Sequence, residues 1–491
     1  MLTLDSPLNT VPAHVRHVYF MGIGGVAMGA LAGALQARGY TVRGSDNPLY
    51  PPMSDFLAGR GIVYASGYQA ENLSGGVRPD LVIIGNVIRR DNPEALACER
   101  MKLHYISLPQ ALRHFFIASN LSIVVAGTHG KTTTTALLAW ILRQAGKKPG
   151  YMVGGLVGGG LDNFAPSERE AGVFVTEGDE YDTAFFDKRP KFIHYNPQIG
   201  ILTSCEFDHG DIYADMRAVS MAFNSFARLT SRTLIAWGDS DEVMACAANT
   251  PARLETYGWA ESNRWRLRQI KPAPAGGMDV YWSDPEGSHY CLHTPLLGEH
   301  NALNLLAAIS ALKAAGLDTE TLITAQESFP GVARRLQERG AINGVMVVDD
   351  FAHHPTAVKK TIAALDTFGM PGWRRQSGRL LAVFEPRSNT SRSRIFQHDY
   401  AASFDQADLV FLRAPGRAED TDPNNRLSVD QLAADINARS DTVKAQAFHD
   451  SDRLLAALLE QIRPGDLCLV MSNGPFDGLH EKLLQKLKQA L

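Results

Sequence analysis

The stretch VVAGTHGKTTT, residues 124–134, decides the fold of this chain. The apolar run over 122–126 predicts a buried strand, and the threonines predict the start of a helix that continues through Arg143. The glycine-rich turn between them has the form Gly-x-x-Gly-Lys-Thr, a shorter variant of the phosphate-binding loop, because Val125 stands where the longer form has a glycine. In this context backbone N–H groups and the lysine bind phosphate, and a threonine reaches Mg²⁺. The stretch therefore predicts a nucleoside triphosphate site in an α/β fold; a plain turn with a solvated lysine is the alternative.

Composition indicates an ordinary globular protein. The chain has 491 residues, 45% apolar and 20% charged, so about three domains are expected. A net charge of −4 gives no reason to expect nucleic acid or a membrane surface as a partner, and no apolar run reaches spanning length. Five scattered cysteines indicate neither a disulfide framework nor a zinc ribbon, and the N-terminus lacks a signal-peptide segment. We therefore expect a cytoplasmic protein.

The first region predicts a second nucleotide-binding turn. Residues 17–23 (HVYFMGI) predict a strand, which leads into a Gly-x-Gly-Gly turn at 22–25 and an Ala- and Leu-rich helix. A second strand over 40–43 ends in Gly-Ser-Asp, which places Asp46 about 20 residues after the turn, as in many dinucleotide-binding sheets. Close packing of helix on strand is the alternative explanation for these glycines.

The remaining pattern predicts strands that alternate with helices. Further strands are predicted at 80–85, 173–177, 199–203, 344–349, 379–384, 408–412 and 466–471, and helices at 108–116 and 302–315. Such alternation predicts parallel sheets covered on both faces, with ligand-binding residues in the loops at the carboxyl ends of the strands. Residues 235–295, rich in Trp and Pro, are expected to be irregular.

Acidic residues follow two of the predicted strands in the middle region. The segment TEGDEYD (176–182) contains four carboxylates, and Glu177 lies nearest the strand. Mg²⁺ takes oxygen ligands and shares them with phosphates, so Glu177 is a candidate metal ligand. In EFDHGD (206–211), His209 could bind a second metal through a neutral imidazole that a neighbouring carboxylate orients. A solvated loop is the alternative for both segments.

The third region also carries polar groups near strand ends. The segment DDFAHHP (349–355) follows a strand, and the pair Arg334–Arg335 precedes it. Arginine suits a γ-phosphate or a carboxylate. EPRSNT (385–390) and Ser472–Asn473–Gly474 follow two other strands, and the first is rich in donors that fit a carboxylate-bearing substrate.

Together these motifs resemble the Mur ligases, which are ATP-dependent amide-bond-forming enzymes of cell-wall precursor assembly. The resemblance covers nearly the whole chain. It is carried by GIGG (22–25), GTHGKTTT (127–134), the Glu177 loop, DHGD (208–211), GEHN (298–301), Arg334–Arg335 and DDFAHHP (349–355).

The resemblance implies an α/β fold with three domains. They are a Rossmann-like domain for the UDP substrate over 1–117, a central P-loop ATPase domain over 118–330, and a Rossmann-like domain that brings the amine over 331–491.

Several segments resemble the branch of the family that joins L-Ala-γ-D-Glu-meso-diaminopimelate to UDP-N-acetylmuramate in peptidoglycan recycling. They are SDNPLYPPMS (45–54), DEYDTAFFDKRPKF (179–192), EFDHGDIY (206–213), EPRSNT (385–390) and MSNGPFDGLH (471–480). The branch that adds L-alanine is the near alternative, although it normally differs at the EPRSNT and MSNG positions. A non-catalytic sensor of UDP-sugars is the alternative from another class.

The resemblance also implies roles for individual residues. Catalysis would rest on Lys131, Glu177, His209 and Arg335. ATP would contact Gly127, Thr128, His129, Gly130, Lys131, Thr132, Thr133, His300, Asn301, Asn304, Arg335 and Asp350. A first Mg²⁺ would be held by Thr132 and Glu177, and a second by His209. The UDP substrate and the peptide would contact Gly22, Gly24, Gly25, Ser45, Asp46, Asn86, His353, Arg387, Ser388 and Asn389. A monomer or a weak homodimer is expected.

Overall fold

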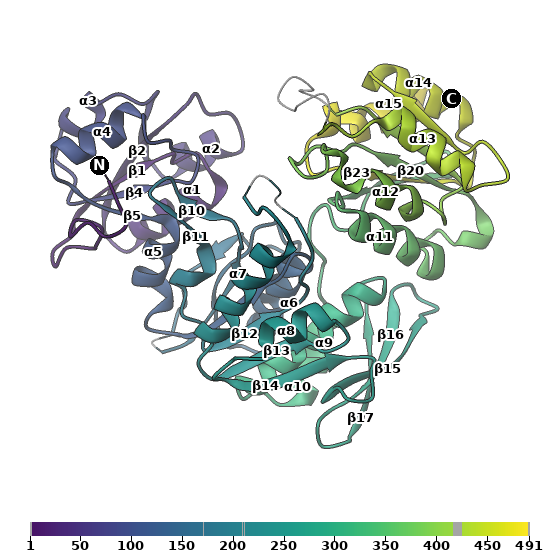
Figure 1. Ribbon diagram of the computed structural model, residues 1–491, viewed down its shortest axis with the longest axis horizontal. Coiled ribbons are helices and arrows are strands. Elements are labelled where there is room, and N and C mark those ends of the chain that lie inside the picture. The colour runs from purple at the N-terminus through teal and green to yellow at the C-terminus, as the bar shows by residue number, and fades with distance from the viewer. Residues whose placement is uncertain (1, 170, 209, 211, 416–424, 490–491) are drawn as a thin grey trace.

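The computed structural model describes residues 2–169, 171–208, 210, 212–415 and 425–489. Three α/β domains follow one another along the chain, and the middle domain lies below the other two in Figure 1. Each domain is built around its own sheet. The predicted boundaries at 117/118 and 330/331 fall between these sheets, and their exact positions stay predictions. Among the described residues, no helix is both long and apolar enough to cross a bilayer.

The N-terminal domain is a parallel sheet of order β3-β2-β1-β4-β5. Its elements are β1 (His17–Met21), α1 (Val26–Ala37), β2 (Thr41–Asp46), α2 (Met53–Gly59), β3 (Val63–Ser66), α3 (Glu71–Ser74), β4 (Leu81–Ile84), α4 (Pro93–Arg100), β5 (His104–Ser107), α5 (Leu108–Leu112) and the π-helical turn η1 (Arg113–Ile117). The strand predicted to end at Arg43 continues to Asp46, because Ser45 and Asp46 pair with β3.

The middle domain has a long mixed sheet of order β17-β16-β15-β14-β13-β12-β6-β9-β7-β8. Its elements are β6 (Leu121–Ala126), α6 (Lys131–Gln144), β7 (Gly150–Met152), β8 (Phe164–Ala165), β9 (Val173–Gly178), β10 (Asp182–Ala184), β11 (Asp187–Pro190), η2 (Lys191–His194), β12 (Ile199–Leu202), α7 (Met216–Leu229), β13 (Thr233–Trp237), α8 (Asp241–Ala247), β14 (Arg253–Gly258), β15 (Trp265–Pro272), β16 (Met278–Ser283), β17 (His289–Thr294), α9 (Glu299–Ala314) and α10 (Thr319–Gln326). Helices α6 and α9 are almost wholly buried, since both pack into the main core of the domain.

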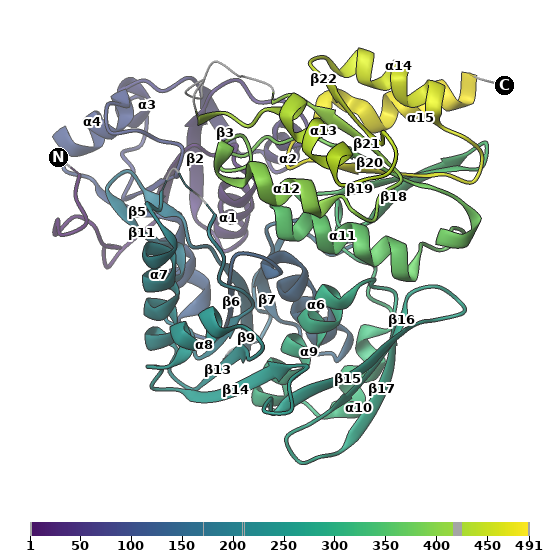
Figure 2. The same cartoon turned by 45° about the vertical axis from the view of Figure 1, so that its right-hand side comes forward.

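The expectation that residues 235–295 are irregular is wrong. This region contains β13 to β17, and β15, β16 and β17 form an antiparallel extension seen at the lower right of Figure 2. Trp265 and Trp282 pack against each other inside it, with ring centroids 5.8 Å apart. The edge strand β17 carries Cys291, which is exposed, whereas the other four cysteines are buried.

The C-terminal domain has a sheet of order β18-β19-β23-β20-β21-β22, antiparallel only between β18 and β19. The elements described are β18 (Gln337–Ile342), β19 (Val345–Asp350), α11 (Pro355–Phe368), η3 (Arg375–Ser377), β20 (Leu380–Phe384), η4 (Arg394–Phe396), α12 (Gln397–Ser403), β21 (Leu409–Arg413), α13 (Val429–Ala438), β22 (Ala445–Phe448), α14 (Ser451–Gln461), β23 (Leu467–Met471), η7 (Phe476–Gly478) and α15 (Leu479–Gln489). Strands β18 and β22 were not predicted; both are edge strands with few buried residues.

Candidate active site

One large cavity lies where the three domains meet. Its volume is about 930 Å³, and its walls come from the strand-end loops of all three sheets. Parallel α/β sheets bind ligands at the carboxyl ends of their strands, so the cavity lies where the sequence pattern predicts a site.

Two glycines shape the phosphate loop between β6 and α6. Gly127 has φ +133°, and a Cβ there would overlap the hydroxyl of Thr203 at the end of β12. Gly130 has φ +85°, and a Cβ there would lie 2.5 Å from Asn304 Oδ1 on α9. Both positions therefore require glycine, on conformational and on steric grounds. Gly127 does not line the cavity, whereas the rest of the loop and the first residues of α6 do: Thr128, His129, Gly130, Lys131, Thr132 and Thr133.

Lys131 is held by a carboxylate that the sequence analysis did not single out. Its Nζ lies 2.8 Å and 3.1 Å from the two carboxylate oxygens of Glu180 and donates to the carbonyl of Gly127 at 2.6 Å. Burial alone would lower the pKa of Lys131, but the charge of Glu180 and neighbouring acids raises it above its ordinary value. The lysine is therefore a permanent cation inside the loop.

Glu177 and Thr132 are side by side, as a shared magnesium site requires. Thr132 Oγ1 donates to Glu177 Oε2 at 3.0 Å, and the Gly154 N–H donates to Oε1. Burial and the charge of Asp179 raise the pKa of Glu177. Asp179 itself is paired with Lys191 at 2.9 Å. Within the described part of the chain Glu177 has no ion-pair partner, so a half-buried carboxylate beside a hydroxyl fits a hard divalent cation.

His209, the other predicted metal ligand, lies outside the described residues. Its neighbour Asp208 is buried and lines the cavity. The Gly210 N–H donates to Thr390 Oγ1 of the C-terminal domain at 3.2 Å. The loop after β12 therefore bridges the middle and C-terminal domains.

The N-terminal part of α9 forms another wall of the cavity. His300, Asn301 and Asn304 all line it, and the Asn301 amide donates to the Leu297 carbonyl at 2.8 Å. Burial, together with nearby positive charges, lowers the pKa of His300 to about 3, so its ring is neutral.

Trp237 and Lys360 also line the cavity, and the sequence did not lead us to predict either residue. Trp237 ends β13, and the Lys360 ammonium lies 5.2 Å from the centre of its ring. Tyr257, at the end of β14, lies beside them in the cavity wall. An indole and a phenol at this position offer a flat apolar surface. Sequence could have indicated Trp237 and Tyr257, because both lie at the ends of strands. Residues 235–295 were expected to be irregular, so these strand ends were not recognised.

The C-terminal domain contributes Arg335, Asp350 and His353 to the cavity. Arg335 is exposed, and its guanidinium lies 5.1 Å from the Phe351 ring centre. Arg334, by contrast, donates to the carbonyls of Ser472 and Gly474 within its own domain. Of the two arginines, Arg335 is therefore the one that lines the cavity, and its contact with ATP stays a prediction.

Asp350 and His353 have supporting contacts. The two carboxylate oxygens of Asp350 accept the N–H groups of Leu336 at 2.7 Å and Ala352 at 2.8 Å, and burial raises the pKa of this carboxyl. His353 Nε2 lies 4.0 Å from Asp208, and burial lowers the pKa of its ring.

The N-terminal wall is formed by the glycine turn, Asp46 and Asn86. Gly22, Gly24 and Gly25 line the cavity, and Asp46 accepts the Gly24 N–H at 2.7 Å. Asp46 also accepts the Tyr68 hydroxyl at 2.9 Å.

Ser45 does not fit its predicted role as a direct ligand. Its hydroxyl donates to the buried carboxylate of Glu94 at 2.5 Å, and its backbone carbonyl accepts the N–H groups of Gly22 and Ile23. A fully buried carboxylate requires donors, and this need turns Ser45 away from the cavity. The residue supports the turn from beneath.

Arg387, Ser388 and Asn389 follow β20 but are not part of the cavity wall. Arg387 lies 3.7 Å from Glu385 and is 40% exposed. Asn389 accepts a hydrogen bond from Arg392, and Ser388 donates to Ser391. These residues form a separate polar cluster outside the cavity wall, next to Thr390, which contacts the loop after β12.

Three models of known protein families match this chain, one for each domain. The model of the Mur ligase family, catalytic domain, matches residues 17–119. The Mur ligase middle domain matches 125–312, and the Mur ligase, glutamate ligase domain, matches 334–474.

Individual relatives match along almost their full length. The UDP-N-acetylmuramate–L-alanyl-γ-D-glutamyl-meso-2,6-diaminoheptandioate ligase of Escherichia coli K12 is 39% identical, over 96% of this chain and 98% of its own. The UDP-N-acetylmuramate–L-alanine ligase of Renibacterium salmoninarum is 33% identical, over 93% of each chain. A crystal structure of a murein peptide ligase from Psychrobacter arcticus superimposes with a TM-score of 0.68 at 31% identity, covering 96% of this chain and 98% of that one.

The three matched segments coincide with the three sheets that meet at the cavity, and full-length relatives exceed 30% identity. The chain belongs to the Mur ligase family.

Proposed function

We propose that this chain is an ATP-dependent ligase that joins L-Ala-γ-D-Glu-meso-diaminopimelate to UDP-N-acetylmuramate, with release of ADP and phosphate, in peptidoglycan recycling. The observation that carries this proposal is the 39% identity over nearly the whole length to a relative of that name. The relative named for L-alanine addition is less similar, at 33%.

The arrangement around the phosphate loop supports activation of a carboxylate by ATP. A carboxylate oxygen is a poor leaving group, so the lactyl carboxylate of UDP-N-acetylmuramate would first be phosphorylated, and the amine would then attack the acyl phosphate. Lys131 and Arg335 face the cavity from two domains, where their charges would stabilise the transferring phosphoryl group. Thr132 and Glu177 would hold one Mg²⁺ and His209 a second, and these ions would supply further neutralising charge when bound.

The other walls would hold the remaining parts of the substrates. His300, Asn301 and Asn304 would contact ATP, with Trp237 as an apolar surface for its base. The turn at Gly22, Gly24 and Gly25 would bind the UDP part with Asp46 and Asn86. Arg387, Ser388 and Asn389 would bind the peptide outside the cavity wall. Domain closure would then bring the amine to the cavity and exclude water from the acyl phosphate. Cytoplasmic location and a monomer or weak homodimer stay predictions.

The test is phosphate release from ATP in the presence of Mg²⁺ and UDP-N-acetylmuramate, with either the tripeptide or L-alanine as the amine. Turnover with the tripeptide alone is the expected result. Turnover with L-alanine alone would refute the proposed amine and assign the chain to the biosynthetic reaction. Absence of turnover with both amines would favour a UDP-sugar sensor.

A further inference from the structure

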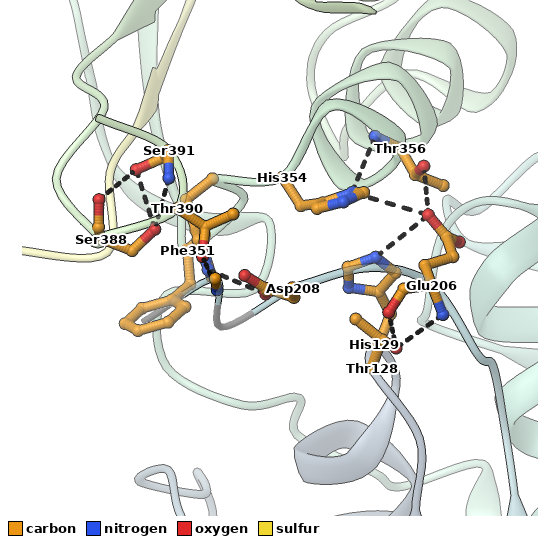
Figure 3. A network of polar contacts seen from close by, with 12 residues as sticks. Thr128, His129, Glu206, Asp208, Phe351, His354, Thr356, Ser388, Thr390 and Ser391 are labelled. Atoms are coloured by element: carbon orange, nitrogen blue, oxygen red, sulfur yellow. Dashed lines mark hydrogen bonds and ion pairs between the residues drawn. The ribbon is translucent and has the colours of Figure 1, made fainter. Parts of the chain in front are cut away.

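Three potential metal ligands converge beside the phosphate loop, on residues other than Thr132 and Glu177. They are His129 of the loop, Glu206 after β12 and His354 at the start of α11 (Figure 3). Glu206 Oε2 lies 3.6 Å from His129 Nε2 and 3.6 Å from His354 Nδ1. All three ligand atoms lie within 4.8 Å of one another.

Neighbouring groups form hydrogen bonds with these side chains, in the way that hydrogen-bond partners orient the ligands of a metal ion in known sites. His354 Nε2 lies 3.2 Å from the Phe207 carbonyl, which can only accept, so Nε2 carries the proton and Nδ1 offers its lone pair to the cluster. Thr356 Oγ1 donates to Glu206 Oε2 at 2.5 Å. Metal-bound imidazoles and carboxylates have the same kinds of partner, a backbone carbonyl and a hydroxyl.

The two imidazole nitrogens of the cluster lack strong hydrogen-bond partners. His129 Nε2 is buried and has no hydrogen-bond partner among the described residues. His354 Nδ1 accepts the Thr356 N–H only at 3.3 Å. The separations of 3.6 Å exceed a hydrogen bond, yet they are close to the ~3.4 Å that separates two ligands bound tetrahedrally at ~2.1 Å to Zn²⁺.

We propose that His129, Glu206 and His354 form a binding site for a transition-metal ion of the zinc class, with water in the fourth position. Two imidazoles and one carboxylate are the ligand set of open zinc sites, whereas Mg²⁺ and Ca²⁺ prefer oxygen ligands alone. His354 and Thr356 belong to the C-terminal domain, and His129 and Glu206 to the middle domain. A bound ion would therefore tie the phosphate loop to the C-terminal domain and oppose domain opening.

The first experiment measures metal binding by the wild-type chain without substrates. Co²⁺ should give the visible absorption of tetrahedral coordination, and Zn²⁺ should displace it with one site per chain. Absence of this signal at micromolar protein and metal would overturn the proposal without any variant. Because no turnover is measured, failure here leaves the proposed ligase activity untouched.

Variants then assign the site. Glu206→Gln and His354→Gln should each lose the Co²⁺ signal, and Thr356→Val should weaken binding by about 10- to 100-fold because it removes the hydrogen bond to Glu206. His449→Gln is the matched control, since His449 is exposed and also lies near an acid, Asp430 at 3.2 Å. Glu177→Gln should keep the signal. Its loss in Glu177→Gln, or its survival in folded Glu206→Gln, would place the ion elsewhere and refute the assignment.

Discussion

Replacing Glu180 by glutamine should tighten nucleotide binding. In the structure both carboxylate oxygens of Glu180 hold Lys131, and the glutamate side chain is only 3% exposed. Glutamine keeps the shape and one acceptor but removes the negative charge. Lys131 then lacks its directly paired carboxylate until a phosphate arrives.

The magnitude follows from this pair. A hydrogen bond to a charged group contributes about 1.5–3 kcal/mol. The ligand-free enzyme loses that contribution, whereas in the nucleotide complex a phosphate oxygen replaces it. The difference appears as affinity, which corresponds to a decrease in Kd of about 10- to 150-fold.

The assay is titration calorimetry with a non-hydrolysable ATP analogue and Mg²⁺. Asp182→Asn is the matched control, because it makes the same charge change nearby in a carboxylate that pairs with the exposed Lys188 at 2.6 Å. The control should leave Kd within about twofold, as expected for a surface pair. An unchanged or weaker affinity in Glu180→Gln would refute the reasoning, because Glu180 would then support the nucleotide and not compete with it.

Three further predictions concern other parts of the site. Lys131→Ala should lower kcat by at least about 10²–10³-fold with the fold intact by circular dichroism, because it removes a charge at the phosphoryl group; near-normal turnover would contradict the ATPase assignment. Arg387→Ala should raise the KM for the tripeptide about 10-fold or more and leave the KM for ATP nearly unchanged, and equal effects would exclude a peptide contact. His300 has a pKa of about 3 in the folded chain, so the unfolded chain binds its proton first and stability falls as the pH decreases from about 6.5 toward 3, by at most about 1.4 kcal/mol per pH unit. His300→Asn should give a flatter dependence in urea unfolding over that range; parallel curves would show that this ring does not titrate on unfolding.

Much of the architecture could be predicted because strong local patterns coincide with the fold. The apolar run before Gly127 is β6, and the threonine-rich segment after Gly130 begins α6. In β16 the alternation was also present, since Met278, Val280 and Trp282 are buried. The neighbouring prolines and glycines hid this period of two, so the extension was missed.

The site was less predictable because it depends on contacts between distant segments. Sequence placed four carboxylates at and after the end of β9 but could not show that Glu180, and not Glu177, pairs with Lys131. The family resemblance implied that Ser45 contacts the UDP substrate, whereas in the structure its hydroxyl donates to the buried carboxylate of Glu94. Likewise Glu206 is a candidate metal ligand only because His129 and His354 lie beside it, and these two residues belong to different domains.

The placement of the cysteines makes the chain convenient to label. Burial raises the pKa of Cys98 and Cys468 to about 12, and the sulfurs of Cys205 and Cys246 face each other inside the middle domain, 3.7 Å apart. Cys291 alone among the five is exposed, on the outer strand of the antiparallel extension. A maleimide dye would therefore mark the native chain at this strand, without any cysteine having to be removed. Paired with a second dye introduced on the C-terminal domain, it would report movements between the two domains as a change in resonance energy transfer.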